Sequence, residues 1–148
     1  MHAGQRAADQ LGFRATGGGA GERPPRLDWP ATAQARNQLD AAERYHACDM
    51  RDDDYFSHDS KDWNGSSHIT VCSFSQRIQN FYFNYQLAGE NIAAGYPSPQ
   101  AVMNGWLDSA GHRMNIERDT FYEIGVGYCA PGGYYGRYWV QNFGRRFN

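Results

Sequence analysis

Cysteine is scarce in this chain of 148 residues. Cys48, Cys72 and Cys129 are an odd number, and no two of them have the C-x-x-C spacing of a zinc knuckle. The sequence is compatible with two alternatives and does not indicate which cysteines would pair. The first is one disulfide with one free thiol, and the second is three buried thiols that act as small apolar side chains. The chain is long enough to bury a sizeable core without several covalent cross-links.

Long apolar runs and an excess of one charge are also absent. No apolar stretch approaches the ~18 residues of a membrane-spanning helix, so the sequence predicts no transmembrane segment. The formal net charge is −2, so we expect no nucleic-acid partner and no electrostatic attachment to an anionic membrane. The first ten residues, MHAGQRAADQ, lack the apolar centre of a signal peptide. This indicates either a cytosolic protein or a chain from which an export signal has been removed.

Glycine and proline gather in one stretch near the start of the chain. The segment ATGGGAGERPP, at 15–25, is typical of a surface loop or flexible linker. We therefore divide the chain into an N-terminal part, residues 1–26, in which 2–13 could form a short helix, and one domain over residues 27–148. The length fits a single domain of ordinary size.

Apolar periodicity predicts helices first, then a strand, more helices and a hairpin. Residues 32–50 have helical spacing and place His46 on the apolar face, where a packed histidine bonded to backbone is favoured over a ligand. We then expect a turn at 60–68, a short helix or loop at 75–85 and a strand at 89–96. A helix at 98–109, capped by Ser98, and a short helix after Ser109 follow. The last expected elements are strands at 123–130 and 134–143. This order predicts an α+β fold with helices on an antiparallel sheet.

Four polar side chains stand at the boundaries of these elements. His58 lies in a loop, Glu90 and Glu123 each open a predicted strand, and His112 lies in the first turn of the short helix. Neutral imidazoles bind divalent transition metals, and a carboxylate can complete the shell or orient an imidazole. The same groups could perform acid–base chemistry, because histidine titrates near neutrality. Spacing alone does not decide between metal binding and acid–base chemistry, since no short metal motif such as HExxH occurs.

Two of these residues also have a purely structural interpretation. Glu90 could cap backbone N–H groups or pair with an arginine such as Arg113, and His112 could be a surface residue of a helix N-terminus, where the neutral imidazole is favoured. Asn91 and Asn115 are expected to bond to backbone rather than react, and no serine stands out as a nucleophile. We predict core positions for Trp106, Val126, Trp139 and Phe143, whereas Tyr96, Tyr134 and Tyr135 could line a groove.

Five motifs occur in a characteristic order: YFSHDS, AGENIAAGY, AVMNGWLDSAGHRMNI, FYEIGVGY and YGRYWVQNFG. Together they resemble a bacterial member of the CAP superfamily of cysteine-rich secretory proteins, antigen 5 and pathogenesis-related proteins, also called the SCP domain. The resemblance covers about Leu27 to Gly144. It implies a three-layer α-β-α sandwich with a small antiparallel sheet and an open cleft.

The resemblance also implies a cleft tetrad of two histidines and two acidic residues. His58 matches the first histidine, Glu90 the acid of the GEN motif and His112 the second histidine. Many eukaryotic members have the fourth residue, a glutamate, just after the tryptophan that Trp106 matches. Here Leu107, Asp108 and Ser109 follow that tryptophan, so Glu123 is the candidate and Asp108 the reserve. In some relatives the paired histidines hold zinc or another divalent ion.

Two classes of function follow from the resemblance. The first is a secreted or envelope-facing module whose His/Glu cleft binds a divalent metal, or a ligand such as a lipid, peptide or polysaccharide. The alternative is a hydrolase, a peptidase or esterase, in which Glu90, with Glu123 as second acid, assists attack by water. A purely structural domain would leave the two histidines and two acids unexplained. We expect a monomer or weak dimer without a transmembrane segment, and an export signal that has been removed.

Overall fold

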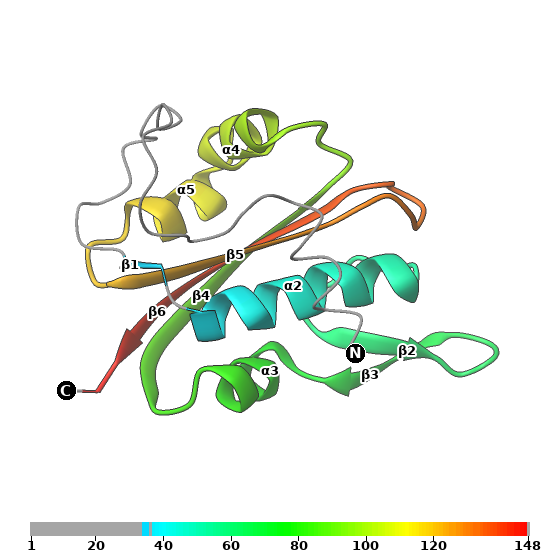
Figure 1. The fold of residues 1–148 in the computed structure, drawn as a ribbon, viewed down its shortest axis with the longest axis horizontal. Helices are drawn as coiled ribbons and strands as arrows, with labels where there is room; N and C mark the ends of the chain where they lie inside the picture. The colour runs from blue at the N-terminus through cyan, green and yellow to red at the C-terminus, as the bar shows by residue number, and fades with distance from the viewer. Residues whose placement is uncertain (1–33, 36, 148) are drawn as a thin grey trace, which may run out of the picture.

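The structure is a computed structural model that describes residues 34–35 and 37–147 (Figure 1). The expected helix at 2–13 and loop at 15–25 lie outside these residues. The described helices are α2 (Asn37–Asp52), α3 (Phe74–Phe81), α4 (Pro99–Asp108) and α5 (Ala110–Glu117). The described strands are β1 (Gln34–Ala35), β2 (Ser60–Trp63), β3 (His68–Cys72), β4 (Tyr85–Ala94), β5 (Glu123–Cys129) and β6 (Tyr138–Arg146).

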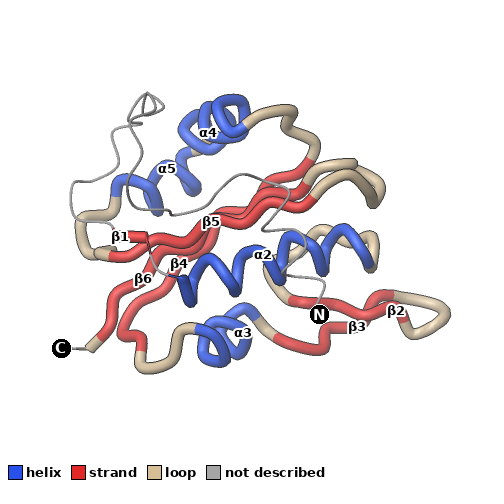
Figure 2. Tube along the Cα trace, viewed as in Figure 1, coloured by secondary structure: helices blue, strands red, loops and turns tan. Residues whose placement is uncertain are grey.

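The predicted α+β fold with helices on a small antiparallel sheet is confirmed, with one parallel strand pair that the sequence analysis did not predict. Within the described residues the main sheet has the order β1-β5-β6-β4, and only β1 runs parallel to its neighbour. Helices α2 and α3 lie on one side of this sheet and α4 and α5 on the other, which gives three layers (Figures 1 and 2). Strand β4 is an edge strand, so residues from both helical layers can meet beside it.

Three apolar clusters are found among the described residues, and the two largest fill the spaces on either side of β4. Successive residues of β4 divide between them, because side chains of a strand alternate between faces: Ile92 packs with Ala47 and Met50 of α2, and Ala93 packs with Val102 and Trp106 of α4. The N-terminus of α4 begins as predicted, with the Ser98 side chain accepting a hydrogen bond from the Ala101 N–H. The predicted core positions of Trp106, Trp139 and Phe143 are also confirmed.

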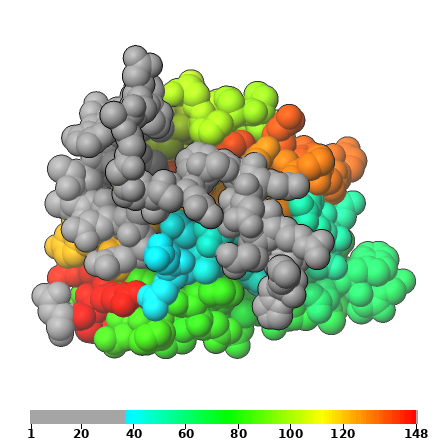
Figure 3. Space-filling model, in the orientation of Figure 1, coloured from blue at the N-terminus to red at the C-terminus, as the bar shows by residue number. Residues whose placement is uncertain are grey.

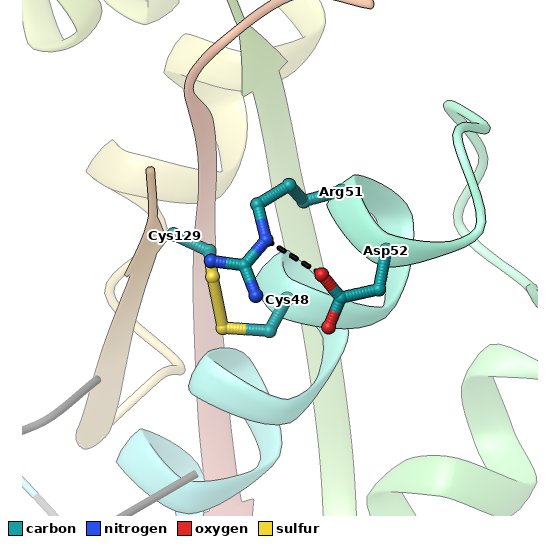
Figure 4. Close-up of a disulfide and its surroundings, with 4 residues drawn as sticks. All are labelled: Cys48, Arg51, Asp52 and Cys129. Carbon is teal, nitrogen blue, oxygen red and sulfur yellow. Dashed lines mark hydrogen bonds and ion pairs between the residues drawn. A yellow bond between two sulfur atoms is a disulfide. The ribbon is translucent and has the colours of Figure 1, made fainter. Parts of the chain in front are cut away.

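Helix α2 is fastened to β5 by a covalent bond. Cys48 of the helix and Cys129 of the strand form a disulfide (Figure 4). Cys72 is a free thiol. Of the two alternatives for the cysteines, the structure shows one disulfide with one free thiol. Arg51 and Asp52, one turn along the helix, form an ion pair of 2.7 Å between Nε and Oδ1 (Figure 4).

The N-terminal part of the predicted helix over 32–50 is wrong where the structure describes it. Ala35 belongs to the short strand β1, and α2 begins at Asn37 and continues to Asp52. Val126 is 39% exposed rather than buried. It lies on β5 beyond the two-residue strand β1, where its N–H donates to the Asp40 side chain instead of to a neighbouring strand.

The turn predicted over 60–68 is part of a hairpin, β2–β3, that extends to Cys72. Its loop is short because Gly65 has a φ of +99°, which favours glycine, and the Asn64 side chain accepts hydrogen bonds from the N–H groups of Ser66 and Ser67. The return strand also begins later than predicted, at Tyr138. The turn continues through Gly133 and Gly136, whose φ values are +62° and +74°.

The close approach of α2 to β5 requires a glycine at position 127. A methyl group there would overlap the backbone carbonyl group of Glu43. We expect Gly127→Ala to lower the free energy of unfolding by at least about 1–3 kcal/mol, the usual cost of overpacking, measured by chemical denaturation. The matched control is Gly111→Ala in α5, where a methyl group meets no atom within 4 Å. Equal stability of the two variants would contradict this account of the packing.

Candidate functional site

Glu90 lies in the middle of β4 rather than at its start. Its side chain is 2% exposed, and both of its oxygens are engaged. Oε1 lies 2.8 Å from His58 Nδ1, and Oε2 lies 2.6 Å from a terminal nitrogen of Arg77. A carboxylate only accepts hydrogen bonds, so His58 Nδ1 is the donor in its contact with Glu90. The remaining nitrogen of His58, Nε2, then presents a lone pair.

Arg77 is a residue that the sequence analysis missed. It lies on α3 with its side chain 1% exposed, and it also donates to the His58 carbonyl oxygen at 2.9 Å and to Ser60 Oγ at 3.3 Å. The suggested partner of Glu90, Arg113, instead donates to the Leu107 carbonyl oxygen. The available signal was the capping box from Ser73 to Gln76, which places Arg77 in the first turns of a helix beside the buried Ile78.

The loop that carries His58 is held from two sides. The Nε2–H of His46, on α2, donates to the Ser57 carbonyl oxygen at 2.9 Å, and Arg77 binds the next carbonyl, that of His58. Burial, followed by the nearby Arg77 charge, lowers the pKa of His46 to about 3. The prediction that His46 is a packed histidine bonded to backbone is therefore confirmed. The His58 side chain itself remains 55% exposed.

His112 reaches the same region from the opposite helical layer. Asn91 of β4 donates to the His112 carbonyl oxygen at 3.1 Å, and Asn115 of α5 donates to the Glu90 carbonyl oxygen at 3.2 Å. As predicted, these asparagines bond to backbone, and they tie α5 to the edge strand. Burial and then the proximity of His58 lower the pKa of His112, which favours its neutral imidazole.

Glu123 does not join this group. It accepts a hydrogen bond from the Tyr82 hydroxyl and lies 3.5 Å from Arg146 Nε. Its register neighbour is Gly144 of β6, which pairs with Ala88 of β4, so a whole strand separates Glu123 from β4. The reserve candidate, Asp108, is exposed at the end of α4. No cluster of three or more metal-ligating side chains is found within the described part of the chain.

A second buried acid, Glu43 of α2, lies close enough to Glu90 for their charges to interact. The sequence analysis missed this residue as well. Glu43 is fully buried and accepts a hydrogen bond from the Asn142 side chain. Burial, followed by the charge of Glu90, raises the pKa of Glu43 well above its usual value. The backbone of Glu43 lies against Gly127 of β5, where the missing side chain allows α2 to approach the sheet. This position depends on how the helix packs, which no local sequence pattern reveals.

The three tyrosines proposed for a groove differ in their surroundings. Tyr96 packs against the core beneath α4, and Trp139 donates to its carbonyl oxygen at 3.0 Å. Tyr134 is 83% exposed, and Tyr135 contacts the ring of Phe56, two residues before His58, with ring centroids 6.0 Å apart. Exposed rings therefore extend along the surface from the loop that holds His58.

Comparison with protein families identifies the family of the chain. The family model described as "Cysteine-rich secretory protein family", CAP, matches residues 30–143. The chain belongs to the CAP family. Its CAP domain extends over more than half of the chain and includes His58, Glu90 and His112.

Bacterial proteins are among its relatives. The uncharacterized protein YkwD of Bacillus subtilis (strain 168) is 36% identical over 110 residues, which are 74% of this chain and 38% of YkwD. The uncharacterized membrane protein YlbC of the same organism is 34% identical over 102 residues, 69% of this chain and 25% of YlbC. The chain thus spans well under half the length of these relatives.

Solved structures support the fold. An extracellular protein containing an SCP domain from Bacillus anthracis has a TM-score of 0.63 and 36% identity, over 77% of this chain and 34% of that one. An outer surface protein from Borrelia burgdorferi has a TM-score of 0.63 at 19% identity, over 78% of each chain, and shows the fold alone. Within residues 34–147 as described, no helix of the CAP domain is long and apolar enough to cross a bilayer.

The Arg77–Glu90 pair predicts a specific pattern of stabilities. Arg77→Met leaves the Glu90 carboxylate buried without its countercharge, so we expect the free energy of unfolding at neutral pH to fall by about 3–5 kcal/mol. Adding Glu90→Gln to that variant removes the uncompensated charge and should restore part of the loss. Urea denaturation of the single and double variants measures both effects.

The matched control for this cycle is Arg113→Met. Arg113 is exposed and donates one hydrogen bond to a backbone carbonyl, so its loss should cost no more than about 1.5 kcal/mol. If the double variant were as unstable as the sum of the two single variants, Arg77 and Glu90 would not be energetically coupled.

Proposed function

We propose that the CAP domain is a secreted or envelope-facing module that binds a divalent metal, zinc in the first instance, through His58 and His112. The observation that carries this proposal is the hydrogen bond from His58 Nδ1 to the buried Glu90, which leaves Nε2 as the nitrogen available for a metal. Ligating histidines are commonly oriented by a carboxylate in this way. The lowered pKa of His112 supplies a second neutral imidazole.

The donor set fits a metal held by two histidines. Both oxygens of Glu90 are occupied, by His58 and by Arg77, so Glu90 orients a ligand and is not itself one. Two protein ligands leave open positions on the ion, and zinc bound there would supply a Lewis acid for an oxygen donor of a ligand. The exposed rings of Phe56 and Tyr135, beside this site, offer apolar contact to a lipid, peptide or polysaccharide.

Export of the domain is part of the same proposal. The disulfide between Cys48 and Cys129 suits an oxidising compartment. One relative with 36% identity is described as an extracellular protein. Both observations support a location outside the cytosol for this CAP domain.

Metal binding can be tested by isothermal titration of zinc into metal-free protein. We expect one ion per chain for the wild type, and at least about tenfold weaker binding for His58→Ala and for His112→Ala, because each removes one of two ligands. Glu90→Gln should also weaken binding, by the roughly 10–100-fold that is typical of the loss of an orienting group. Circular dichroism of each variant confirms that the fold is retained.

The matched control is His68→Ala, which removes a partly buried histidine whose Nε2 lies 2.6 Å from the Asp53 carbonyl oxygen. This variant should bind zinc as the wild type does. Equal zinc binding by the wild type and the His58→Ala/His112→Ala variant would exclude the proposed site.

Hydrolysis is the second candidate, and one observation favours it. An imidazole oriented by a buried carboxylate is the arrangement of a general base, so His58 Nε2 could accept a proton from water. The neighbouring Ser57 Oγ instead accepts a hydrogen bond from the Asp59 N–H at 3.1 Å, so water is the nucleophile in this scheme. Glu123, which accepts a hydrogen bond from Tyr82, would not contact the attacking water in this scheme.

A panel of peptide and ester substrates tests this candidate. We expect His58→Ala to lower kcat/KM by about 10²-fold or more, the usual contribution of a general base, while Glu123→Gln changes it little. Activity that persists unchanged in His58→Ala would come from another protein in the preparation, and the hydrolase scheme would fail.

A further inference from the structure

The β2–β3 hairpin projects beyond the helices at one end of the molecule (Figures 1 and 3). Its two strands pair only with each other in the described part of the chain. Strand β3 therefore has an outer edge that no described strand covers. A two-stranded hairpin is only marginally stable by itself, and its edge is a template for pairing with another strand.

The register shows which backbone groups point outward from β3. The hairpin closes with a hydrogen bond of 3.1 Å from the Asn64 N–H to the Ser67 carbonyl. Hydrogen-bonded and non-hydrogen-bonded pairs alternate in an antiparallel ladder. Ile69, opposite Asp62, is therefore bonded to β2, whereas the N–H and C=O groups of Thr70, opposite Lys61, point away from β2.

Strand β3 carries none of the side chains that usually protect an edge against pairing. Strand β3, with the sequence HITVC, has no proline, lysine, arginine or acidic residue. The charges Lys61 and Asp62, and the register shift between Ser60 and Lys61, all belong to β2. Ile69 and Val71 are 44% and 49% exposed, although both are β-branched residues suited to a sheet.

We propose that β3 pairs edge to edge with β3 of a second copy of this chain, antiparallel and about a two-fold axis at Thr70. The outward N–H and C=O groups of Thr70 then bond reciprocally with those of Thr70 of the partner subunit. Ile69 faces Val71 of the partner subunit in a non-hydrogen-bonded pair, in which side chains approach most closely.

The observations favour a second copy over a different protein. The pattern Ile-Thr-Val is self-complementary about its central residue, because each apolar side chain meets the other apolar one under a two-fold rotation. The absence of charge on β3 means that symmetry brings no like charges together. The interface uses neither His58 nor His112, so it is independent of the proposed metal site.

Sedimentation velocity over a range of protein concentrations tests the pairing. The wild type should show a monomer–dimer equilibrium. Thr70→Pro removes an N–H group that the hairpin itself does not use, so the fold should remain while dimerisation weakens roughly tenfold or more through the loss of two symmetric hydrogen bonds. Thr70→Val, which keeps the N–H group, is the matched control and should dimerise as the wild type does.

Substitution of Ile69 and Val71 by oppositely charged residues tests the register of the proposed strand pairing. Ile69→Lys places an ammonium group opposite Val71 of the partner subunit and should give a monomer. Adding Val71→Glu to that variant pairs opposite charges across the two-fold axis and should restore the dimer, with a new dependence on salt. A wild type that remains monomeric at all concentrations, a Thr70→Pro variant that dimerises like the wild type, or a double variant that stays monomeric would each overturn the proposal.

Discussion

The buried ion pair between Arg77 and Glu90 belongs to a group of contacts that connects three segments of the chain. Through its second terminal nitrogen Arg77 also binds the His58 carbonyl, so helix α3, strand β4 and the loop before β2 share one cation. A charge this deeply buried is tolerated only when its partners are in place. The orientation of the His58 ring and the conformation of its loop therefore depend on the same few hydrogen bonds that keep α3 against the sheet.

The location of the site at a sheet edge explains how residues from both helical layers can meet. Glu90 and its neighbour Asn91 point to opposite faces of β4, as successive residues of a strand must. Glu90 contacts Arg77 in the layer of α2 and α3, while Asn91 holds the carbonyl of His112 in the layer of α5. An interior strand could not present both faces to one site, because its neighbours would separate them.

The sequence was most informative where local rules dominate. The start of α4 follows from Ser98 and Pro99, and the motifs around His58, Glu90 and His112 indicated residues that the fold brings to one strand edge. The pairing of Glu90 with Arg77 could not be predicted, because it depends on how a short helix docks. The hairpin was missed for a different reason. Periodicity detects strands with one buried face, and most residues of β2 and β3 are exposed on both.

The disulfide between Cys48 and Cys129 encloses more than the contact between α2 and β5. The two cysteines are 81 positions apart, and His58, Arg77, Glu90 and His112 all lie between them. The site is thus contained in a single covalent ring. A protease that cuts one bond within the exposed loop at Gly65 and Ser66 would open this ring without releasing a fragment. If the domain is exported, as proposed above, such a topology confines proteolytic damage to a nick.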